Sequence, residues 1–309
     1  MMRVIFLGTP DFALPSLKAI FDAGHQVVAV VCQPDKPSTR GKIRFSPVKQ
    51  FGIDKGIPVY QFAKIRKEGV EIIKELNPDI MVTAAYGQII SQEILDIPKY
   101  GVINVHGSLL PKYRGAAPIQ QAILDGEKET GITIMQTALA VDSGDILLTV
   151  KTPIEPEETA GELFDRLAEM GAKAVVEGLA LIESGRAVFT PQDHSQATFC
   201  KMFTKEMGLI DFDKDFLTLK NFIRGMNPWP GAFTHVGEKT LKVFSISACE
   251  DNSESPVGSV LFADNKNGLI VKIKNAAVSI DQLQMEGGKR MDAKAYLLGH
   301  KIEVGTILK

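Results

Sequence analysis

The stretch Gly101-Val102-Ile103-Asn104-Val105-His106-Gly107 is a short apolar run in which an amide and an imidazole interrupt the aliphatic side chains. Its valine and isoleucine residues predict a buried strand over residues 102–106. Asn104 and His106 are two residues apart, so both side chains of a strand at this place point to the same face. The stretch therefore predicts a buried sheet with a polar pair near the end of one strand.

Comparable apolar runs alternate with segments of helical periodicity over the first 189 residues. One helix begins at Ser46-Pro47, because serine suits the N-cap and proline the first helical position. Short apolar runs that alternate with helices predict an α/β domain, built on a Rossmann-like parallel sheet that is covered on both faces. The further predicted strands are 4–7, 27–32, 59–60, 80–84, 132–136 and 146–150, and the further predicted helices are 13–23, 67–76 and 159–184.

The pattern changes after this first domain, which we predict to span residues 1–189. Residues 190–208 are polar with little periodicity and are predicted to form a linker. Residues 209–309 contain one predicted helix and then short alternating runs separated by turn residues, which predict a small OB-like β-barrel. The helix is expected at 215–224 and the strands at 232–236, 240–246, 258–262, 269–273 and 276–283.

Composition excludes several classes of protein. Apolar residues make up 45% and charged residues 23%, which indicates a folded chain rather than a disordered one. The amino-terminal segment has a single basic residue and a short apolar run, unlike a signal peptide, and no apolar stretch approaches the roughly 20 residues of a spanning helix. We therefore expect a cytoplasmic protein with no membrane partner. We also expect a monomer.

The positions of the cysteines and glycines argue against a metal site and against a dinucleotide-binding site. Cys32, Cys200 and Cys249 lie far apart and without metal-ligand spacing, so we expect unpaired thiols and no metal. The first strand-to-helix turn has only Gly8 of the three glycines in a dinucleotide fingerprint, which argues against a nicotinamide or flavin cofactor. A net charge of −2 does not by itself indicate a nucleic-acid partner.

The polar pair has two interpretations. Ligands bind beyond the carboxyl ends of parallel strands, where Asn104 would supply an amide donor and His106 a titratable group. Together they suit a developing oxyanion and a proton transfer. The alternative is a polar pair that only satisfies the end of a strand, and the residues alone leave both open. Asp142 lies in Asp142-Ser143-Gly144, which by composition is an ordinary turn.

The segment His106-Gly107-Ser108-Leu109-Leu110-Pro111, taken with Asn104 and the Asp142 turn, resembles the signature of folate-dependent formyltransferases. Members of that family have an Asn-x-His pair on a strand, a Ser-Leu-Leu-Pro loop and a downstream Asp-x-Gly turn. The resemblance implies that Asn104, His106 and Asp142 are catalytic. It also implies that 10-formyltetrahydrofolate is the formyl donor and that no metal takes part.

The resemblance further implies a folate pocket, in loops expected to converge at the carboxyl ends of strands. Tyr86 can equally be part of the sheet packing, and Gly87 can equally serve a simple turn. The implied folate-binding residues are Tyr86, Gly87, Gln88, Ile89, Ser108, Leu109, Leu110, Pro111, Leu139, Ala140 and Val141. Ala140-Val141 departs from the glycine-leucine that the family usually has before its aspartate.

Further matches from residue 4 to about residue 235 resemble the branch of the family that acts on charged initiator tRNA. They include Phe6-Leu7-Gly8-Thr9-Pro10 and Asn227-Pro228-Trp229-Pro230-Gly231. The resemblance implies formylation of the methionine on initiator tRNA in translation initiation, with residues 209–309 as a tRNA-binding domain. Arg40, Lys42 and Arg44 would contact tRNA, although their composition alone predicts a solvated loop. The alternatives are a formyltransferase for an amino sugar or purine precursor, and a non-catalytic nucleic-acid-binding protein.

The implied mechanism assigns one task to each catalytic residue. Asn104 and protonated His106 would stabilise the oxyanion that forms when an amine attacks the formyl carbon. Asp142 would hold His106 in orientation and favour its charged form.

Overall fold

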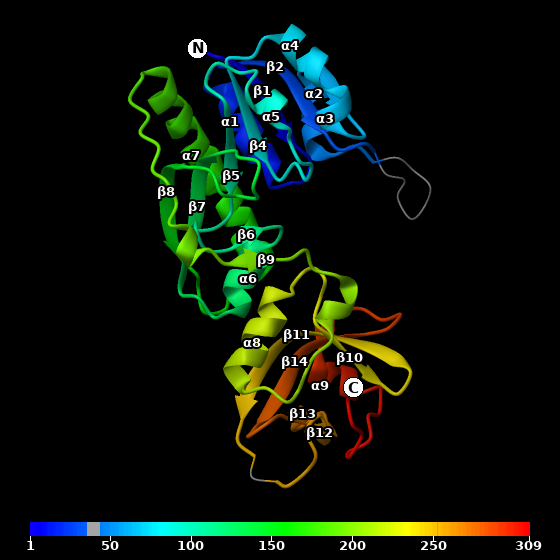
Figure 1. The fold of residues 1–309 in the computed structure, drawn as a ribbon. Coiled ribbons are helices and arrows are strands. Elements are labelled where there is room, and N and C mark those ends of the chain that lie inside the picture. The colour runs from blue at the N-terminus through cyan, green and yellow to red at the C-terminus, as the bar shows by residue number, and fades with distance from the viewer. Residues whose placement is uncertain (36–43, 252) are drawn as a thin grey trace. The chain divides into compact units, whose positions relative to one another are not determined.

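The computed structural model describes residues 1–35, 44–251 and 253–309. Its internal contacts divide the chain into two compact units, which are described separately (Figure 1). The first comprises Met1–Pro118, Glu129–Pro153 and Phe164–Cys200, and the second comprises Ile119–Lys128, Ile154–Leu163 and Lys201–Lys309. The domain boundaries expected from the sequence stay a prediction.

The first unit is built on one mixed sheet, with strand order β3-β2-β1-β4-β5-β7-β8. The first five strands in this order run parallel, as predicted, whereas β7 pairs antiparallel with both β5 and β8. The strands are β1 Arg3–Gly8, β2 Gln26–Cys32, β3 Val59–Gln61, β4 Ile80–Ala84, β5 Val102–His106, β7 Glu129–Gln136 and β8 Ile146–Pro153.

The antiparallel pairing of β8 with β7 follows from the length of their connection. A parallel crossover needs about a dozen residues or more, usually with a helix. Only residues 137–145 join β7 to β8, so the second strand has to run back beside the first. The expected parallel sheet is therefore confirmed for β1 to β5, and the sheet as a whole is mixed.

Helices cover both faces of this sheet. On one face, α1 packs on β1, β2 and β4, α2 packs against α1, and Gly171 of α7 approaches Val105 and Ser16. On the other face, Ile65, Ile73 and Ile94 of α3, α4 and α5 join a buried core with alternate residues of β1, β2 and β4. The helices are α1 Ala13–Asp22, α2 Pro47–Asp54, α3 Ile65–Glu68, α4 Val70–Leu76, α5 Gln92–Leu95 and α7 Ala160–Glu183.

Local sequence signals explain several element boundaries. The Ser46 hydroxyl accepts a bond from Lys49 N at 3.2 Å, which confirms the predicted N-cap of α2. The helix predicted over residues 67–76 is two helices, separated at Gly69, because glycine is a weak helix former. A small parallel pair, β6 Arg114–Gly115 and β9 Phe199–Cys200, was not predicted, since two-residue strands have no periodicity.

The second unit is an antiparallel half-barrel in the order β10-β11-β14-β13-β12, with β15 paired to β14 (Figure 1). Register shifts between Val243 and Ser245 interrupt the β11–β14 ladder, and such bulges bend a strand. Its elements are α6 Pro118–Leu124, α8 Phe216–Gly225, β10 Phe233–Val236, β11 Lys239–Cys249, β12 Val260–Asp264, β13 Gly268–Lys272, β14 Ala277–Met285, β15 Met291–Asp292 and α9 Ala293–Leu297. Among the residues described, no helix is long and apolar enough to cross a membrane.

Gly131 provides a test of how closely β7, β8 and the loop after β5 pack. A Cβ atom at Gly131 would lie 2.1 Å from Val150 O and 2.6 Å from Leu109 Cδ2. We expect Gly131→Ala to lower the free energy of unfolding by about 1–3 kcal/mol, because the added methyl group would clash with Val150 O, and strand pairing limits how far that backbone oxygen can move. Calorimetric unfolding measures this. Gly299→Ala, where a Cβ meets no atom within 4 Å, is the control, and equal losses in both variants would contradict the packing argument.

Candidate active site

The polar pair on β5 faces away from α7. A Cβ at Gly171 of α7 would lie 2.8 Å from Val105 Cγ1, so the Val105 side chain points to that helix. Asn104 and His106 flank Val105 on the strand and therefore point to the opposite face. The sequence prediction that these two side chains share a face agrees with this arrangement.

His106 has an acceptor beside each ring nitrogen. Its Nε2 lies 2.9 Å from Tyr113 O, and because a carbonyl oxygen only accepts, Nε2 carries a proton. Its Nδ1 lies 3.6 Å from Asp142 Oδ2, too far for a direct hydrogen bond but within ion-pair distance. His106 is 5% exposed. A doubly protonated ring can donate from both nitrogens, and Nδ1 is the nitrogen left for a ligand.

Asn104 is oriented by the neighbouring strand. Thr83 on β4 pairs with Asn104, and the Thr83 hydroxyl donates to Asn104 Oδ1 at 2.7 Å. This bond engages the amide oxygen, so the amide nitrogen is the end available for another group. Among the described residues, no hydrogen bond involves Asn104 Nδ2. The side chain is half-buried, so its two N–H donors suit a ligand at the sheet face.

Asp142 reaches the site by an unexpected route. Gln136 at the end of β7 pairs with Ile103 at the start of β5, so the β7–β8 loop leaves at the far end of β5 from His106. The loop then folds back, and Gly115 N donates to Asp142 Oδ2 at 2.7 Å. Asp142 has φ of 47°, in the left-handed region, which an L-residue adopts at a cost of roughly 1–2 kcal/mol. Convergence of strand carboxyl ends thus does not explain this contact.

Two residues near Asp142 were missed by the sequence analysis. Gln192 donates from Nε2 to Asp142 O at 3.0 Å and to Gly144 O at 2.7 Å. Arg114 donates to Gln192 Oε1 from Nε at 3.1 Å and from Nη2 at 2.6 Å. Both side chains are buried, at 6% and 5% exposure. Gln192 lies in the segment expected to be a linker, where no periodicity marked it.

The loop after β4 holds several of the predicted folate-binding residues. Tyr86 is buried, and its hydroxyl has no hydrogen-bond partner in the described part of the chain. Gly87 has φ of 80°, and Ile89 is 68% exposed. Gln88 Nε2 donates to Gln33 Oε1 at 3.1 Å, and Gln33 Nε2 donates to Tyr86 O at 2.9 Å, so this loop is tied to the end of β2.

The loop after β5 is anchored from β7. Thr133 Oγ1 donates to Ser108 O at 2.7 Å and accepts from Leu110 N at 3.2 Å. On the loop between β7 and β8, Leu139 and Val141 are 60% and 59% exposed. Leu109, Pro111 and Ala140 are the other members of these two loops that the sequence analysis selected.

Of the predicted tRNA contacts, Arg40 and Lys42 lie outside the described residues. Arg44 is described and exposed. Nearby, Lys49 forms a partly buried ion pair with Asp35, and this bond holds the pKa of the Asp35 carboxyl below its ordinary value. Gln61 bonds both partners of that pair.

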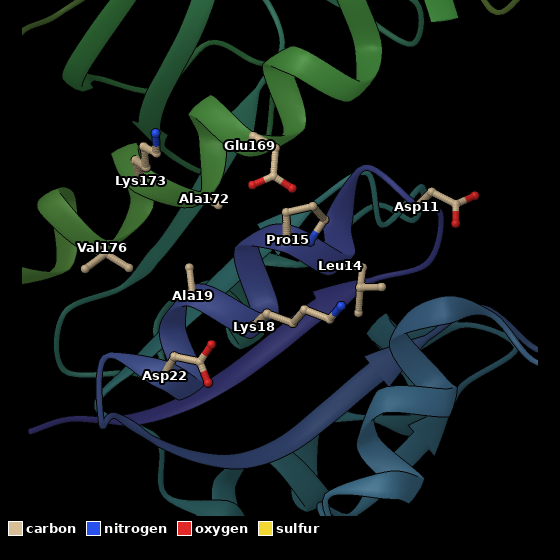
Figure 2. Close-up of a pocket in the computed structure, with 10 residues that line it drawn as sticks. All are labelled: Asp11, Leu14, Pro15, Lys18, Ala19, Asp22, Glu169, Ala172, Lys173 and Val176. Carbon is tan, nitrogen blue, oxygen red and sulfur yellow. The ribbon is translucent and has the colours of Figure 1, made fainter. Parts of the chain in front are cut away.

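A groove of about 760 Å³ lies between α1 and α7 (Figure 2). Its walls carry carboxylates at Asp11, Asp22 and Glu169 and amines at Lys18 and Lys173. None of the three predicted catalytic residues lines this groove. On β5 it is the Val105 side chain that points toward α7, whereas Asn104 and His106 point to the opposite face of the sheet. Within the described ranges, no group of three or more histidine, cysteine or acidic residues could hold a metal ion.

Comparisons with known proteins address the whole chain. Residues 2–179 match the family described as formyl transferase, and residues 202–301 match the formyl transferase C-terminal domain. A methionyl-tRNA formyltransferase from Caldanaerobacter subterraneus subsp. tengcongensis is 47% identical over 311 residues, covering 100% of both chains.

Solved structures share the fold at lower identity. An N-formyltransferase from Helicobacter canadensis, in complex with folinic acid and dTDP-3-aminofucose, has a TM-score of 0.67 at 17% identity, covering 94% of this chain and 100% of that one. HypX from Aquifex aeolicus, in complex with tetrahydrofolic acid, has a TM-score of 0.62 at 18% identity. The comparison covers 96% of this chain and 47% of HypX, so the chain spans about half the length of HypX.

Tyr86 gives a prediction about stability. Burial raises the pKa of Tyr86, so folding favours its neutral form, and stability is lost as the pH rises above the ordinary tyrosine value of about 10. We expect Tyr86→Phe to stabilise the unliganded protein by about 1–2 kcal/mol at pH 7, because it removes a buried hydroxyl without a partner. The variant should also lose less stability between pH 9 and 11. Thermal unfolding over this range tests both, and a less stable variant at pH 7 would contradict the assignment.

Proposed function

The chain belongs to the formyl transferase family, and we propose that Asn104, His106 and Asp142 carry out its reaction. The enzyme transfers a formyl group from 10-formyltetrahydrofolate to the amino group of methionyl-initiator-tRNA, in initiation of translation. One observation carries the proposal for the site: the free amide donors of Asn104 and the Nδ1 of His106 share one sheet face, with the Asp142 carboxylate 3.6 Å from that Nδ1.

The chemistry of the acceptor explains why this set of residues suffices. An α-amino group has a pKa of roughly 8, so much of it is a free nucleophile near neutral pH without a strong base. The barrier lies in the oxyanion that forms when the amine attacks the formyl carbon. Asn104 Nδ2 and charged His106 supply donors to this oxyanion, and one such donor typically lowers the barrier by about 3 kcal/mol.

Proton movement uses the same ring nitrogen of His106, Nδ1, because Nε2 is bonded to Tyr113 O. When bound, 10-formyltetrahydrofolate supplies the formyl carbon and the nitrogen that departs. His106 gives the Nδ1 proton to the departing nitrogen as its bond to the formyl carbon breaks, and the proton of the attacking amine replaces it. The hydrogen bond from Nε2 to Tyr113 O keeps the ring oriented, and Asp142 stabilises the charged ring.

The proposed folate pocket combines apolar and polar groups. Ile89, Leu139 and Val141 expose aliphatic side chains that suit the flat face of a pterin ring. The Tyr86 hydroxyl is a buried polar atom without a partner, and a bound ring nitrogen or carbonyl would satisfy it. The backbone of residues 108–111, fixed by Thr133, borders the same face of β5.

A tRNA-binding role for the half-barrel is supported by side chains of β10, β11 and the residue before β15. Lys242 is exposed and lies opposite Phe233, and the Arg290 guanidinium sits 4.4 Å from the ring centroid of Phe244. Basic and aromatic side chains in this combination suit phosphates and unpaired bases. Lys272 does not belong to this set, because it is buried in an ion pair with Asp251.

The remaining assignments follow from the substrate. Full-length similarity to a methionyl-tRNA formyltransferase at 47% identity favours tRNA over the amino sugar of the 17% identical neighbour. A cytoplasmic location is proposed because initiator tRNA is used there. We propose a monomer, because all three proposed catalytic side chains belong to the same unit of a single chain.

The first functional prediction concerns the donors. We expect Asn104→Ala and His106→Ala each to lower turnover at least about 100-fold, because each removes an oxyanion donor or the proton carrier. The assay uses purified protein, 10-formyltetrahydrofolate and methionyl-initiator-tRNA, and detects formylmethionine. His25→Ala, in the turn before β2, is the matched control with near-normal turnover. Near-normal turnover of a folded Asn104 or His106 variant would refute the site.

The second functional prediction concerns the basic loop. We expect Arg40→Ala, Lys42→Ala and Arg44→Ala, combined, to raise the KM for tRNA severalfold and to weaken its dependence on salt, because phosphate contacts release counterions. Folate-analogue binding should change little. The matched control removes the same charge from exposed positions of and beside α3, by Lys64→Ala, Arg66→Ala and Lys67→Ala. If both triple variants show the same kinetics at two salt concentrations, the basic loop does not contact tRNA.

A further inference from the structure

The Asp142 loop needs external support to reach His106. It leaves β7 beside Ile103, folds back across the sheet face and holds Asp142 in the left-handed region. At Gly144, a Cβ would lie 1.9 Å from Gln136 O, so the backbone returns very close to its own strand. A loop with this conformation persists only where its surroundings determine it.

Gln192 supplies that support from a distant segment. Its amide nitrogen has two hydrogens, and both are used, one on Asp142 O and one on Gly144 O. Two hydrogen bonds to carbonyls two residues apart fix the turn that carries the carboxylate. The backbone beside Gln192 is itself fixed, because Thr190 forms an antiparallel bridge with Ile146 at the start of β8.

Arg114 determines which way the Gln192 amide points. A guanidinium only donates, so the two bonds from Arg114 require the amide oxygen of Gln192 on that side. The amide nitrogen must then face the two loop carbonyls. The usual ambiguity between the oxygen and nitrogen of an amide therefore does not arise here.

The two neighbours of Arg114 in the chain contact His106 and Asp142. The carbonyl of Tyr113 accepts from His106, and the N–H of Gly115 donates to the Asp142 carboxylate. Three consecutive residues thus hold the imidazole, the supporting amide and the carboxylate. A shift of the Asp142 loop would be felt at the Nδ1 of His106.

We infer that Gln192 is a positioning residue, which holds the Asp142 carboxylate beside His106 through its two bonds to the loop and is oriented by Arg114. The effect that this role has on turnover rests on the proposed function. The effect on the position of the Asp142 carboxylate is independent of that function.

The first test uses Gln192→Glu, which keeps the shape and the bonds from Arg114. A carboxylate has no hydrogen for the two loop carbonyls and repels them. We expect turnover in methionyl-initiator-tRNA formylation to fall about 10- to 100-fold, because small displacements of catalytic groups are costly, while the melting temperature stays close to that of the parent protein. Gln192→Met, without any donor or charge, should lower turnover in the same way. Gln196→Glu, an exposed glutamine bonded only within its own turn, should leave turnover unchanged.

A double-mutant cycle separates positioning from general destabilisation. If Gln192 acts through the Asp142 carboxylate, Gln192→Glu should change turnover less than about threefold once Asp142→Ala is present. An equal loss of turnover in both backgrounds would overturn the inference.

Hydrogen exchange tests the position of the carboxylate without any assay of formylation. The Gly115 amide is bonded to Asp142 Oδ2, so it reports directly on this contact. We expect its exchange to become at least about tenfold faster in Gln192→Glu and to stay unchanged in Gln196→Glu. Unchanged exchange in Gln192→Glu would overturn the inference. The parent protein could instead be inactive in formylation while Gly115 exchange is faster in Gln192→Glu. That result would overturn the proposed function and leave the positioning role in place.

Discussion

The site is organised around a buried imidazole that has a backbone carbonyl bonded to one ring nitrogen and a carboxylate near the other. His106 is almost fully removed from water, and an unpaired polar group in that position would cost about 1–3 kcal/mol. The carbonyl of Tyr113, seven residues along the chain, accepts from Nε2, and the carboxylate of Asp142 lies 3.6 Å from Nδ1. The loops after β5 and β7 have to take up conformations that bring these two groups to the ring. The two residues that supply these groups both lie in the left-handed region, with φ of 61° at Tyr113 and 47° at Asp142.

The mixed sheet makes this arrangement possible. Parallel strands alone would place the loop that follows each strand at one edge, whereas the antiparallel β7 starts the Asp142 loop at the opposite end of β5 from His106. On this face α3, α4 and α5 pack with residues of β1, β2 and β4, and Asn104 on β5 is only half-buried. A half-open face bordered by exposed aliphatic side chains suits a reaction between a flat folate and the end of a large macromolecule.

The enzyme has two very different partners, a folate and a tRNA, and the proposed roles divide them between the two units. The first unit carries the proposed chemistry on buried, hydrogen-bonded side chains. The second unit presents basic and aromatic residues on an antiparallel sheet, including Lys242 and the stacked Arg290 and Phe244. The net charge of the chain is −2, so attraction of a tRNA would depend on a local group of basic side chains rather than on an overall basic protein.

Local patterns in the sequence determined the strand at residues 102–106, the N-cap at Ser46 and the shared face of Asn104 and His106, because strand periodicity and capping depend on neighbouring residues only. The family resemblance added Asp142, whose own sequence predicts a simple turn. The tertiary structure alone decided that β7 runs antiparallel, that the Asp142 loop folds back, and that Gln192 holds it. The bond between Gln192 and Asp142 joins residues 50 positions apart. Such contacts depend on how whole strands pair, and no local period in the sequence encodes that pairing.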